Sequence, residues 1–184
     1  MDNGASSYRR FLEGDDSGMV ELVRDYKDGL LLYLNSLIHN LDAAEDCVQD
    51  TFIKLAIKKP VFRGKASFKT WLYTIGRNVA VSYMRKNARH SETLLDEYAD
   101  IAAETDLERD YLREEQKITL HRAMHRLKQE HCQVLVLTYF EGFGNQEAAK
   151  IMGKSRKQVE NLLYYAKKSL RSELEKEGFH YEEL

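Results

Sequence analysis

The carboxylates of Asp46 and Asp50 lie four positions apart in a segment of helical periodicity, with the amide of Gln49 beside them. Side chains at this spacing share one face of a helix. Paired carboxylates can act as acid and base, but no nucleophile, metal-ligand cluster or glycine-rich phosphate loop accompanies this pair. We therefore interpret the face as a surface that docks on a partner protein. The sequence predicts no enzyme, no cofactor and no metal site.

A second group of residues is suited to nucleic acid and lies in a basic block. Residues 51–91 contain ten Lys or Arg and no Asp or Glu, although the formal net charge of the chain is −2. A local positive surface, not the total charge, decides whether a protein attracts phosphates. Lys and Arg side chains that neutralise phosphates release the counterions bound to the nucleic acid. Aromatic rings among these side chains stack on unpaired bases, which stabilises binding by about 1–3 kcal/mol per base. The candidate cations are Arg63, Lys65, Lys69, Arg77, Arg85, Lys86 and Arg89.

Other residues of the block divide between core and surface. Phe68 and Trp71 fall on the apolar stripe of a predicted helix, so packing is the better interpretation, whereas Tyr73 lies on the other face with Lys69 and Arg77. Phe62, in the basic loop after a proline, could fill the core or stack on a base. Asn78, at the edge of the stripe, could reach a base edge or face solvent.

The last third of the chain carries a helix-turn-helix pattern. A short predicted helix over 146–152 is closed by Gly153, a residue suited to a left-handed C-cap, and Ser155 with Gln158 forms a capping box for a long helix. Helix-turn-helix proteins place such a second helix in the DNA major groove. Plain helical hairpins share the pattern, so the segment alone leaves both alternatives open.

These residues are positioned by an all-α fold. The chain has one proline and many Leu, Lys, Glu and Ala residues. We expect the first helix to begin near Ser17, where an apolar stripe starts, and a third long helix over about 67–89. The second helix is expected to start at an N-cap, Asp42, and to run to about Lys58, because Pro60 stops it.

The elements group into two predicted domains, at 15–90 and 117–178. The segment between them, 91–116, contains ten Asp or Glu and two Arg with weak periodicity, which is typical of an acidic linker. Whether the two domains pack together is left open. Cys47 and Cys132 are expected to be buried free thiols in a reducing compartment. No apolar run approaches the roughly 20 residues of a membrane span, so we expect a soluble, cytoplasmic protein.

Three ordered segments match the patterns of a known family. Residues 42–52 (DAAEDCVQDTF) are similar to the pattern DAEDLVQETF, and residues 62–78 contain FRG, FKTWL and IGRN in the order of the family's next segment. Residues 135–153 resemble its C-terminal pattern L-x-L-x-Y-x-E-G, E-E-I-A and G. The family is that of bacterial sigma-70 transcription factors, and the two-domain layout resembles the extracytoplasmic-function subfamily. The resemblance covers about residues 15–175.

The resemblance implies a role for each segment. The helix with Asp46, Gln49, Asp50 and Phe52 would bind the clamp helices of the largest subunit of core RNA polymerase. The basic block would bind the separated strand of the −10 element, hold a flipped base and follow the adjoining DNA. Its residues are Phe62, Arg63, Lys65, Lys69, Arg77, Asn78, Arg85, Lys86 and Arg89.

The helix-turn-helix would read the −35 element of promoter DNA. Its candidate residues are Ser155, Arg156, Lys157, Gln158, Asn161, Tyr165 and Lys168. Many members carry T-V-K-S-R-L where residues 158–163 read QVENLL, so Glu160 and Leu162 replace cations. We expect either an altered −35 preference, with Gln158 and Asn161 reading bases, or weak −35 binding. An anti-sigma factor is a further candidate partner.

Two other functions stay open from the residues alone. A helix-turn-helix regulator that binds duplex DNA as a dimer would explain residues 118–176. It would not explain the Asp46 helix or the basic third helix. A helical protein that binds a partner without DNA activity is compatible with the altered recognition helix, whereas a nucleic-acid enzyme lacks a catalytic constellation.

Overall fold

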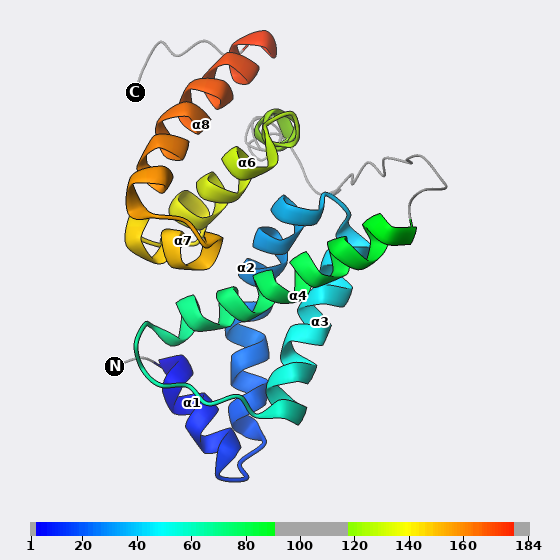
Figure 1. The fold of residues 1–184 in the computed structure, drawn as a ribbon, viewed down its shortest axis with the longest axis vertical. Coiled ribbons are helices and arrows are strands. Elements are labelled where there is room, and N and C mark those ends of the chain that lie inside the picture. The colour runs from blue at the N-terminus through cyan, green and yellow to red at the C-terminus, as the bar shows by residue number, and fades with distance from the viewer. Residues whose placement is uncertain (1–2, 91–117, 179–184) are drawn as a thin grey trace, which may run out of the picture.

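The computed structural model describes residues 3–90 and 118–178, and the predicted linker at 91–116 lies outside them (Figure 1). Every regular element in these two ranges is helical, which confirms the all-α prediction. None of the helices described is long and apolar enough to cross a membrane. The elements are a helical segment at 118–125 and α1 (Asn3–Leu12), α2 (Ser17–Ile38), α3 (Leu41–Lys58), α4 (Phe68–His90), α6 (Gln129–Leu135), η1 (Val136–Phe140), α7 (Asn145–Met152) and α8 (Arg156–Lys176).

Helices α2, α3 and α4 form the body of the first half. The last of them, α4, crosses the other two (Figure 1), and the apolar stripes of all three helices meet in one core. This core contains the positions that the periodicity predicts to be apolar and inward-facing. Its fully buried members include Leu30, Leu34, Val48, Leu55 and Leu72.

The caps of α3 differ from the prediction at one end. Asn40, not Asp42, is the N-cap, and its side-chain oxygen accepts a hydrogen bond from the Ala43 N–H at 2.9 Å. Both residue types cap helices well, but Asp42 already lies in the first turn. The other end is as predicted, because α3 ends at Lys58, two residues before Pro60.

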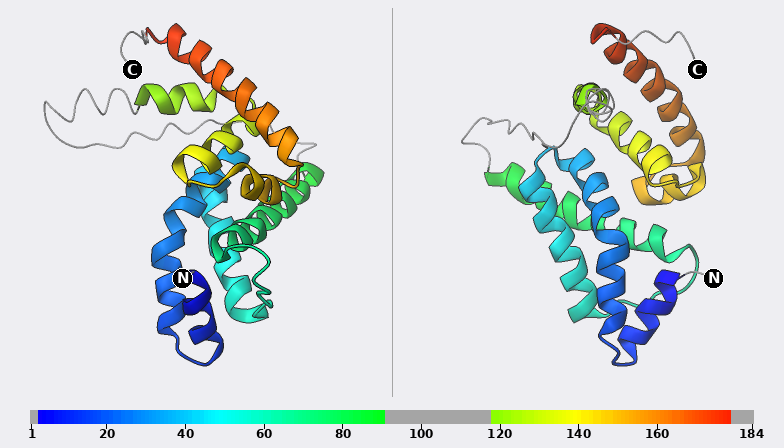
Figure 2. Two further views of the ribbon diagram at one scale, coloured as in Figure 1. Left: turned by 90° about the vertical axis from the view of Figure 1, so that its left-hand side faces the viewer. Right: turned by 180° about the vertical axis from the view of Figure 1, so that it is seen from behind.

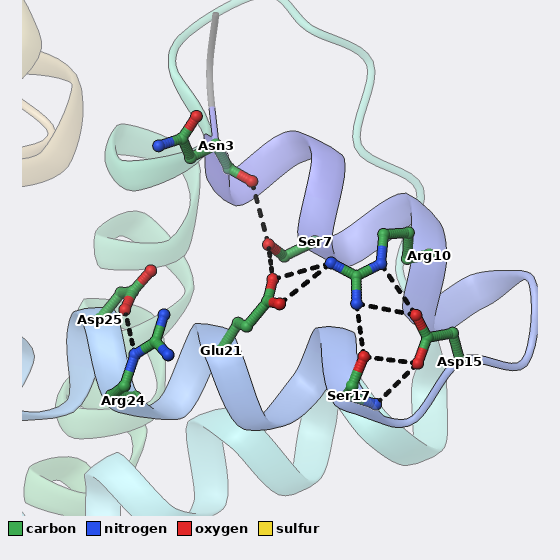
Figure 3. Close-up of polar contacts among 8 residues, drawn as sticks. All are labelled: Asn3, Ser7, Arg10, Asp15, Ser17, Glu21, Arg24 and Asp25. Carbon is green, nitrogen blue, oxygen red and sulfur yellow. Dashed lines mark hydrogen bonds and ion pairs between the residues drawn. The ribbon is translucent and has the colours of Figure 1, made fainter.

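Helix α2 begins at Ser17, as predicted, but it is not the first helix, because α1 comes before it. In α1, Ser7 Oγ donates to Glu21 Oε2 at 2.7 Å, and Arg10 Nη1 lies 3.0 Å from Glu21 Oε1 (Figure 3). Arg10 also pairs with Asp15 at 2.8 Å. The large buried apolar side chains of α1 are Tyr8 and Phe11, and two such residues in ten positions are too few for a stripe that predicts a helix.

The second half is a helix-turn-helix unit. Helix α6 leads into the π-helix η1, at whose end the Glu141 N–H donates to the Val136 carbonyl at 3.0 Å. Gly153 closes α7 in the predicted left-handed conformation, with φ of 65°. The predicted capping box opens α8: Ser155 Oγ accepts from the Gln158 N–H at 3.2 Å, and Gln158 Oε1 accepts from the Ser155 N–H at 2.7 Å.

The two described halves share one hydrophobic core. Helix α7 packs on α4, and α6 with η1 packs on α2 (Figure 1, Figure 2). The Gln129 side-chain amide donates to the Leu37 carbonyl across this boundary. The second half therefore covers part of α4, the basic third helix of the prediction. The sequence alone leaves open whether the two domains pack together.

The substitution Gly18→Ala tests the contact between α1 and α2. A Cβ at Gly18 would collide with backbone atoms of Ser7 and Phe11, so α1 has to move away. We expect the free energy of unfolding to fall by about 1–3 kcal/mol, the usual cost of overpacking, although alanine favours a helix by about 1 kcal/mol over glycine. Thermal unfolding followed by circular dichroism measures the change. Val20→Ala, at an exposed position of α2, is the control, and an equal Tm for both variants would contradict the described packing of α1.

Candidate nucleic-acid and partner interfaces

One exposed face of α3 carries the predicted partner-binding residues. Asp46, Gln49 and Asp50 are all exposed there. Ile53 and Ile57 extend the face at three- and four-residue steps, with exposed fractions of 50% and 71%. We call these five residues the α3 stripe. Sequence reasoning missed the two isoleucines, although they stand at i+3 and i+7 from Asp50, because apolar residues on a helix are normally assigned to its core. Aliphatic side chains open to solvent beside carboxylates indicate a docking surface.

Burial separates the aromatic residues that were predicted for the sites. Phe52 is 8% exposed and belongs to the core, so its ring is not part of the α3 stripe. Phe68 is fully buried, as predicted. Trp71 and Phe62 are half-buried, with their ring centroids 5.2 Å apart. Phe62 therefore packs on the core with part of its ring, while another part remains accessible, and its stacking on a base stays a prediction.

Helix α1 supports the basic loop between α3 and α4. The Tyr8 ring packs on Trp71 at 5.5 Å, and its hydroxyl donates to the Pro60 carbonyl at 2.8 Å. Burial raises the pKa of Tyr8 to about 12, so this hydroxyl remains a donor at neutral pH. Sequence reasoning missed Tyr8 because its helix was not predicted. The loop is thus fixed at its start and on its inner side.

The outer surface of the loop and of α4 is basic. Gly64 makes the turn of the loop with φ of 66°. The exposed members of the predicted group are Arg63, Lys65, Asn78, Arg85 and Lys86. Arg89 belongs to α4, but its side chain lies outside the described part of the structure. The described cations therefore place exposed positive charge on the loop, at Arg63 and Lys65, and on the later part of α4, at Arg85 and Lys86.

The inner face of α4 is covered by the second half. Lys69, Tyr73 and Arg77 share this face, as predicted, but Lys69 Nζ lies 2.9 Å from Glu141 Oε2 and Tyr73 is fully buried. The Tyr73 hydroxyl donates to the same carboxylate at 2.5 Å. Burial and then the Glu141 hydrogen bond raise the pKa of Tyr73 far above its ordinary value, so its proton stays in place. Sequence periodicity describes one helix at a time, so it could not predict that the second half covers this face of α4.

A second carboxylate and an aromatic ring extend this contact. The Thr70 hydroxyl donates to Glu147 Oε1 at 3.0 Å. The Phe143 ring meets Tyr73 edge-on, with centroids 5.0 Å apart, and Lys69 Nζ lies 4.8 Å from the Phe143 centroid. The loop before α7 and its first turn therefore bring two acids and one ring to the basic helix.

A groove of about 400 Å³ lies between α4 and the second half. Arg77 and Arg85 contribute positive charge on the α4 side, and Lys154 and Glu130 lie on the other side. Within the described residues, the buried Arg77 Nε has no hydrogen-bond partner. The apolar lining residues are Leu37, Val81, Met84, Ala88 and Met152.

The predicted DNA-reading face of α8 is open. Arg156 pairs with Glu160 at 2.8 Å, so part of its charge is compensated. The capping box occupies the Gln158 carbonyl, which leaves its NH₂ group for a base, whereas no described residue hydrogen-bonds the Asn161 amide. Asn161 is therefore the better candidate reader of adenine. The exposed residues of this face are Ser155, Arg156, Lys157, Gln158, Asn161, Tyr165 and Lys168.

Possible metal ligands and thiols were the other candidates for chemistry in the described residues. Among them, no three His, Cys, Asp or Glu side chains are placed to hold a metal ion. Cys47 and Cys132 are buried free thiols, as predicted, and burial raises their pKa to about 11 and about 12. Thiols with raised pKa values are poor nucleophiles.

Known families match most of the chain. Residues 22–90 match the family described as Sigma-70 region 2, and residues 117–170 match Sigma-70, region 4. The RNA polymerase sigma factor YlaC of Bacillus subtilis is 32% identical over 158 residues, which are 85% of this chain and 91% of that protein. The ECF RNA polymerase sigma factor SigW of the same organism is 25% identical over 173 residues, covering 88% of this chain and 91% of the relative.

Solved structures share the fold over the same range. A chain from the complex of the sigma factor RpoE with the anti-sigma factor NepR from Bartonella quintana has a TM-score of 0.68 at 27% identity, covering 84% of this chain and 95% of that one. A chain from the complex of CnrH with the cytosolic domain of CnrY has a TM-score of 0.63 at 22% identity, covering 94% and 95%. The latter is a likeness of fold alone.

The substitution Ser155→Ala tests the start of the DNA-reading helix. It removes the side-chain acceptor of the Gln158 N–H, so the first turn of α8 loses a cap worth about 1 kcal/mol. We expect a lower free energy of unfolding by that amount, measured by urea denaturation. Ser172→Ala, an exposed serine later in α8, is the control and should not destabilise the protein. Equal effects of the two substitutions would show that the capping box contributes nothing.

Proposed function

This chain belongs to the sigma-70 family as an RNA polymerase sigma factor of the extracytoplasmic-function type, which directs transcription initiation at specific promoters, and we propose how its surfaces divide the contacts that this activity needs. Such a factor is not an enzyme. A helix-turn-helix regulator of another kind is excluded, because residues 22–90 belong to sigma region 2. The factor acts where polymerase and promoter DNA meet, in the bacterial cytoplasm.

The α3 stripe is the surface that binds core RNA polymerase. The observation that carries this assignment is the exposure of Ile53 and Ile57 in line with Asp46 and Asp50. Exposed aliphatic residues next to polar ones on one helix face are typical of a helix that packs on other helices. The clamp helices of the largest subunit are the partner that suits this geometry. Phe52 acts from the core by holding α3 in position.

The basic loop and α4 bind the −10 element. Arg63 and Lys65 project from a loop whose inner side is fixed on Tyr8 and Trp71, so cations and the accessible part of Phe62 are presented together. This combination suits an unpaired strand, whose phosphates need cations and whose bases need a ring. Asn78, Arg85, Lys86 and Arg89 lie further along α4 and follow the adjoining DNA.

Helix α8 reads the −35 element in the major groove. Its exposed N-terminal turns carry Lys157, Asn161, Tyr165 and Lys168 on one side. Cations position the helix on phosphates, and Asn161 provides the amide for a base edge. The ion pair with Glu160 compensates the charge of Arg156. This supports a −35 sequence preference different from that of sigma factors with cations at the positions of Glu160 and Leu162.

The groove between α4 and the second half accepts an anti-sigma factor. Its apolar floor and its arginine rim suit an amphipathic helix with acidic residues. The similar sigma factor RpoE is known in complex with the anti-sigma factor NepR. A helix in this groove would hold the two halves together and keep α4 away from DNA.

The triple substitution Asp46→Ala/Gln49→Ala/Asp50→Ala tests the polymerase contact. We expect the affinity of the factor for core RNA polymerase to fall at least about tenfold, since each interface side chain lost at a hot spot costs about 1 kcal/mol or more. Surface plasmon resonance with immobilised core enzyme measures the dissociation constant. Asp25→Ala/Asp28→Ala removes two exposed acids from α2 and should leave the affinity unchanged. Equal affinities of all three proteins would contradict the assignment.

The double substitution Arg63→Ala/Lys65→Ala tests the −10 contact. The variant loses two cations, so the slope of log K against log salt concentration for a forked promoter with an unpaired −10 strand should decrease by about 1.4. Electrophoretic mobility shifts of the polymerase complex over a salt series give this slope. Lys54→Ala/Lys58→Ala, at exposed positions of α3, removes the same charge elsewhere and serves as the control. The assignment fails if the control changes the slope as much as the loop variant.

A further inference from the structure

The loop between α3 and α4 is held at both of its ends by the short helix α1. The loop begins at Lys59, directly after α3, and α4 begins at Phe68. At the first end, the Tyr8 hydroxyl of α1 donates to the Pro60 carbonyl at 2.8 Å. At the second end, the Tyr8 and Phe68 ring centroids lie 5.5 Å apart, and a Cβ on Gly4 would lie 2.5 Å from Phe68 Cδ1. Helix α1 therefore contacts the chain on both sides of the loop.

Phe11, one turn after Tyr8 on α1, makes a second contact with the start of the loop. The Lys59 ammonium lies 5.1 Å from the centroid of the Phe11 ring, a distance suited to a cation–π interaction. Lys59 has a φ of 43°, in the left-handed region that favours glycine, but a glycine could not make this contact. Two successive residues of the loop are thus bound by two aromatic residues that share one face of α1.

Aromatic packing connects α1 to the part of the loop that is assigned to DNA. The Tyr8 ring packs on Trp71 with centroids 5.5 Å apart, and Trp71 packs on Phe62 at 5.2 Å. Phe62 also meets Phe68 edge-on, with centroids 5.6 Å apart. Tyr8 and Phe68 are buried, whereas part of Phe62 remains accessible. The position of the accessible ring therefore depends on a buried ring of α1.

We propose that Tyr8 is a positioning residue for the capture of an unpaired base of the −10 element and acts through Phe62. This inference rests on the proposed function, because it assigns the loop to the −10 strand. Stacking needs a defined geometry between the ring and the base, so the orientation of Phe62 decides how well the loop distinguishes a base from an empty position. A loop that is already ordered by α1 also loses less conformational freedom when it binds.

The substitution Tyr8→Phe tests the proposal, because it removes the contact with the Pro60 carbonyl and keeps the ring. Core RNA polymerase with the full chain is titrated with forked promoter DNA whose −10 strand is unpaired, and with copies that carry one abasic nucleotide in that strand. The measured quantity is the ratio of the affinities for intact and abasic DNA. We expect the largest ratio of the series to fall about threefold in Tyr8→Phe, the effect of one lost hydrogen bond. It should fall further in Tyr8→Leu, which also loses the ring.

Ser7→Ala is the matched control. Ser7 is the neighbour of Tyr8 on α1, but its hydroxyl donates to Glu21 Oε2 on α2 at 2.7 Å and not to the loop. The control therefore weakens α1 by a lost hydrogen bond without a change at the loop, and its affinity ratio should equal that of wild type. A general loss of folded protein lowers both affinities equally, so the ratio responds to the loop and not to stability alone.

Trp71 is the only tryptophan of the chain and reports on the same packing in the free protein. Acrylamide quenching of its fluorescence measures how accessible the ring is. We expect the quenching constant to rise in Tyr8→Phe, because the Tyr8 ring that packs on Trp71 is no longer fixed through its hydroxyl. The constant should stay at the wild-type value in Ser7→Ala.

The affinity ratios separate a failure of this proposal from a failure of the proposed function. A large wild-type ratio that Tyr8→Phe leaves unchanged overturns the role of Tyr8 alone, and so does a Ser7→Ala variant with a ratio as low as that of Tyr8→Phe. A wild-type ratio close to one at every abasic position would show that the loop captures no base. That result would overturn the −10 assignment together with this proposal.

Discussion

The Glu141 carboxylate, held between the Lys69 ammonium and the Tyr73 hydroxyl, is the interaction on which the placement of the two halves depends. A carboxylate that is largely removed from water is costly unless it is paired and hydrogen-bonded. Its two donors both come from α4, so the loop before α7 can rest at one position on that helix only. The Phe143 ring adds contact area against Tyr73, and α6 with η1 packs on α2 in the same core.

The packing of the two halves covers one of the three candidate binding surfaces and leaves the other two exposed. The α3 stripe and the exposed face of α8 point to solvent, whereas the inner face of α4 is covered. The buried Arg77 Nε finds no hydrogen-bond partner among the described residues, and an unmet buried donor costs about 1–3 kcal/mol. Arg77 lines the groove between α4 and the second half, so this unmet donor lies where the two halves approach each other.

Periodicity predicted the helices whose apolar stripes are long, and capping chemistry predicted Gly153 and the box at Ser155. Capping chemistry could not decide whether Asn40 or Asp42 is the N-cap of α3. Both residue types cap well, and only the tertiary path of the chain selects one of them. Periodicity missed α1, whose large buried apolar residues, Tyr8 and Phe11, are too few to form a recognisable stripe. At the candidate sites, the sequence identified the carboxylates of α3 and the cations of the loop. It did not identify Ile53 and Ile57 as exposed or Tyr73 as buried, because both depend on which neighbour covers a helix face.

The π-helix η1 has a consequence for how the position of Glu141 depends on the length of the chain. A π-turn contains one residue more than an α-turn, and each residue rotates a helix by about 100°. The bond from the Glu141 N–H to the Val136 carbonyl closes such a turn, and the Glu141 carboxylate that follows it contacts Lys69. Deletion of one residue within 136–140 would therefore present another side chain to α4, so the contact between the halves depends on chain length as well as on residue type.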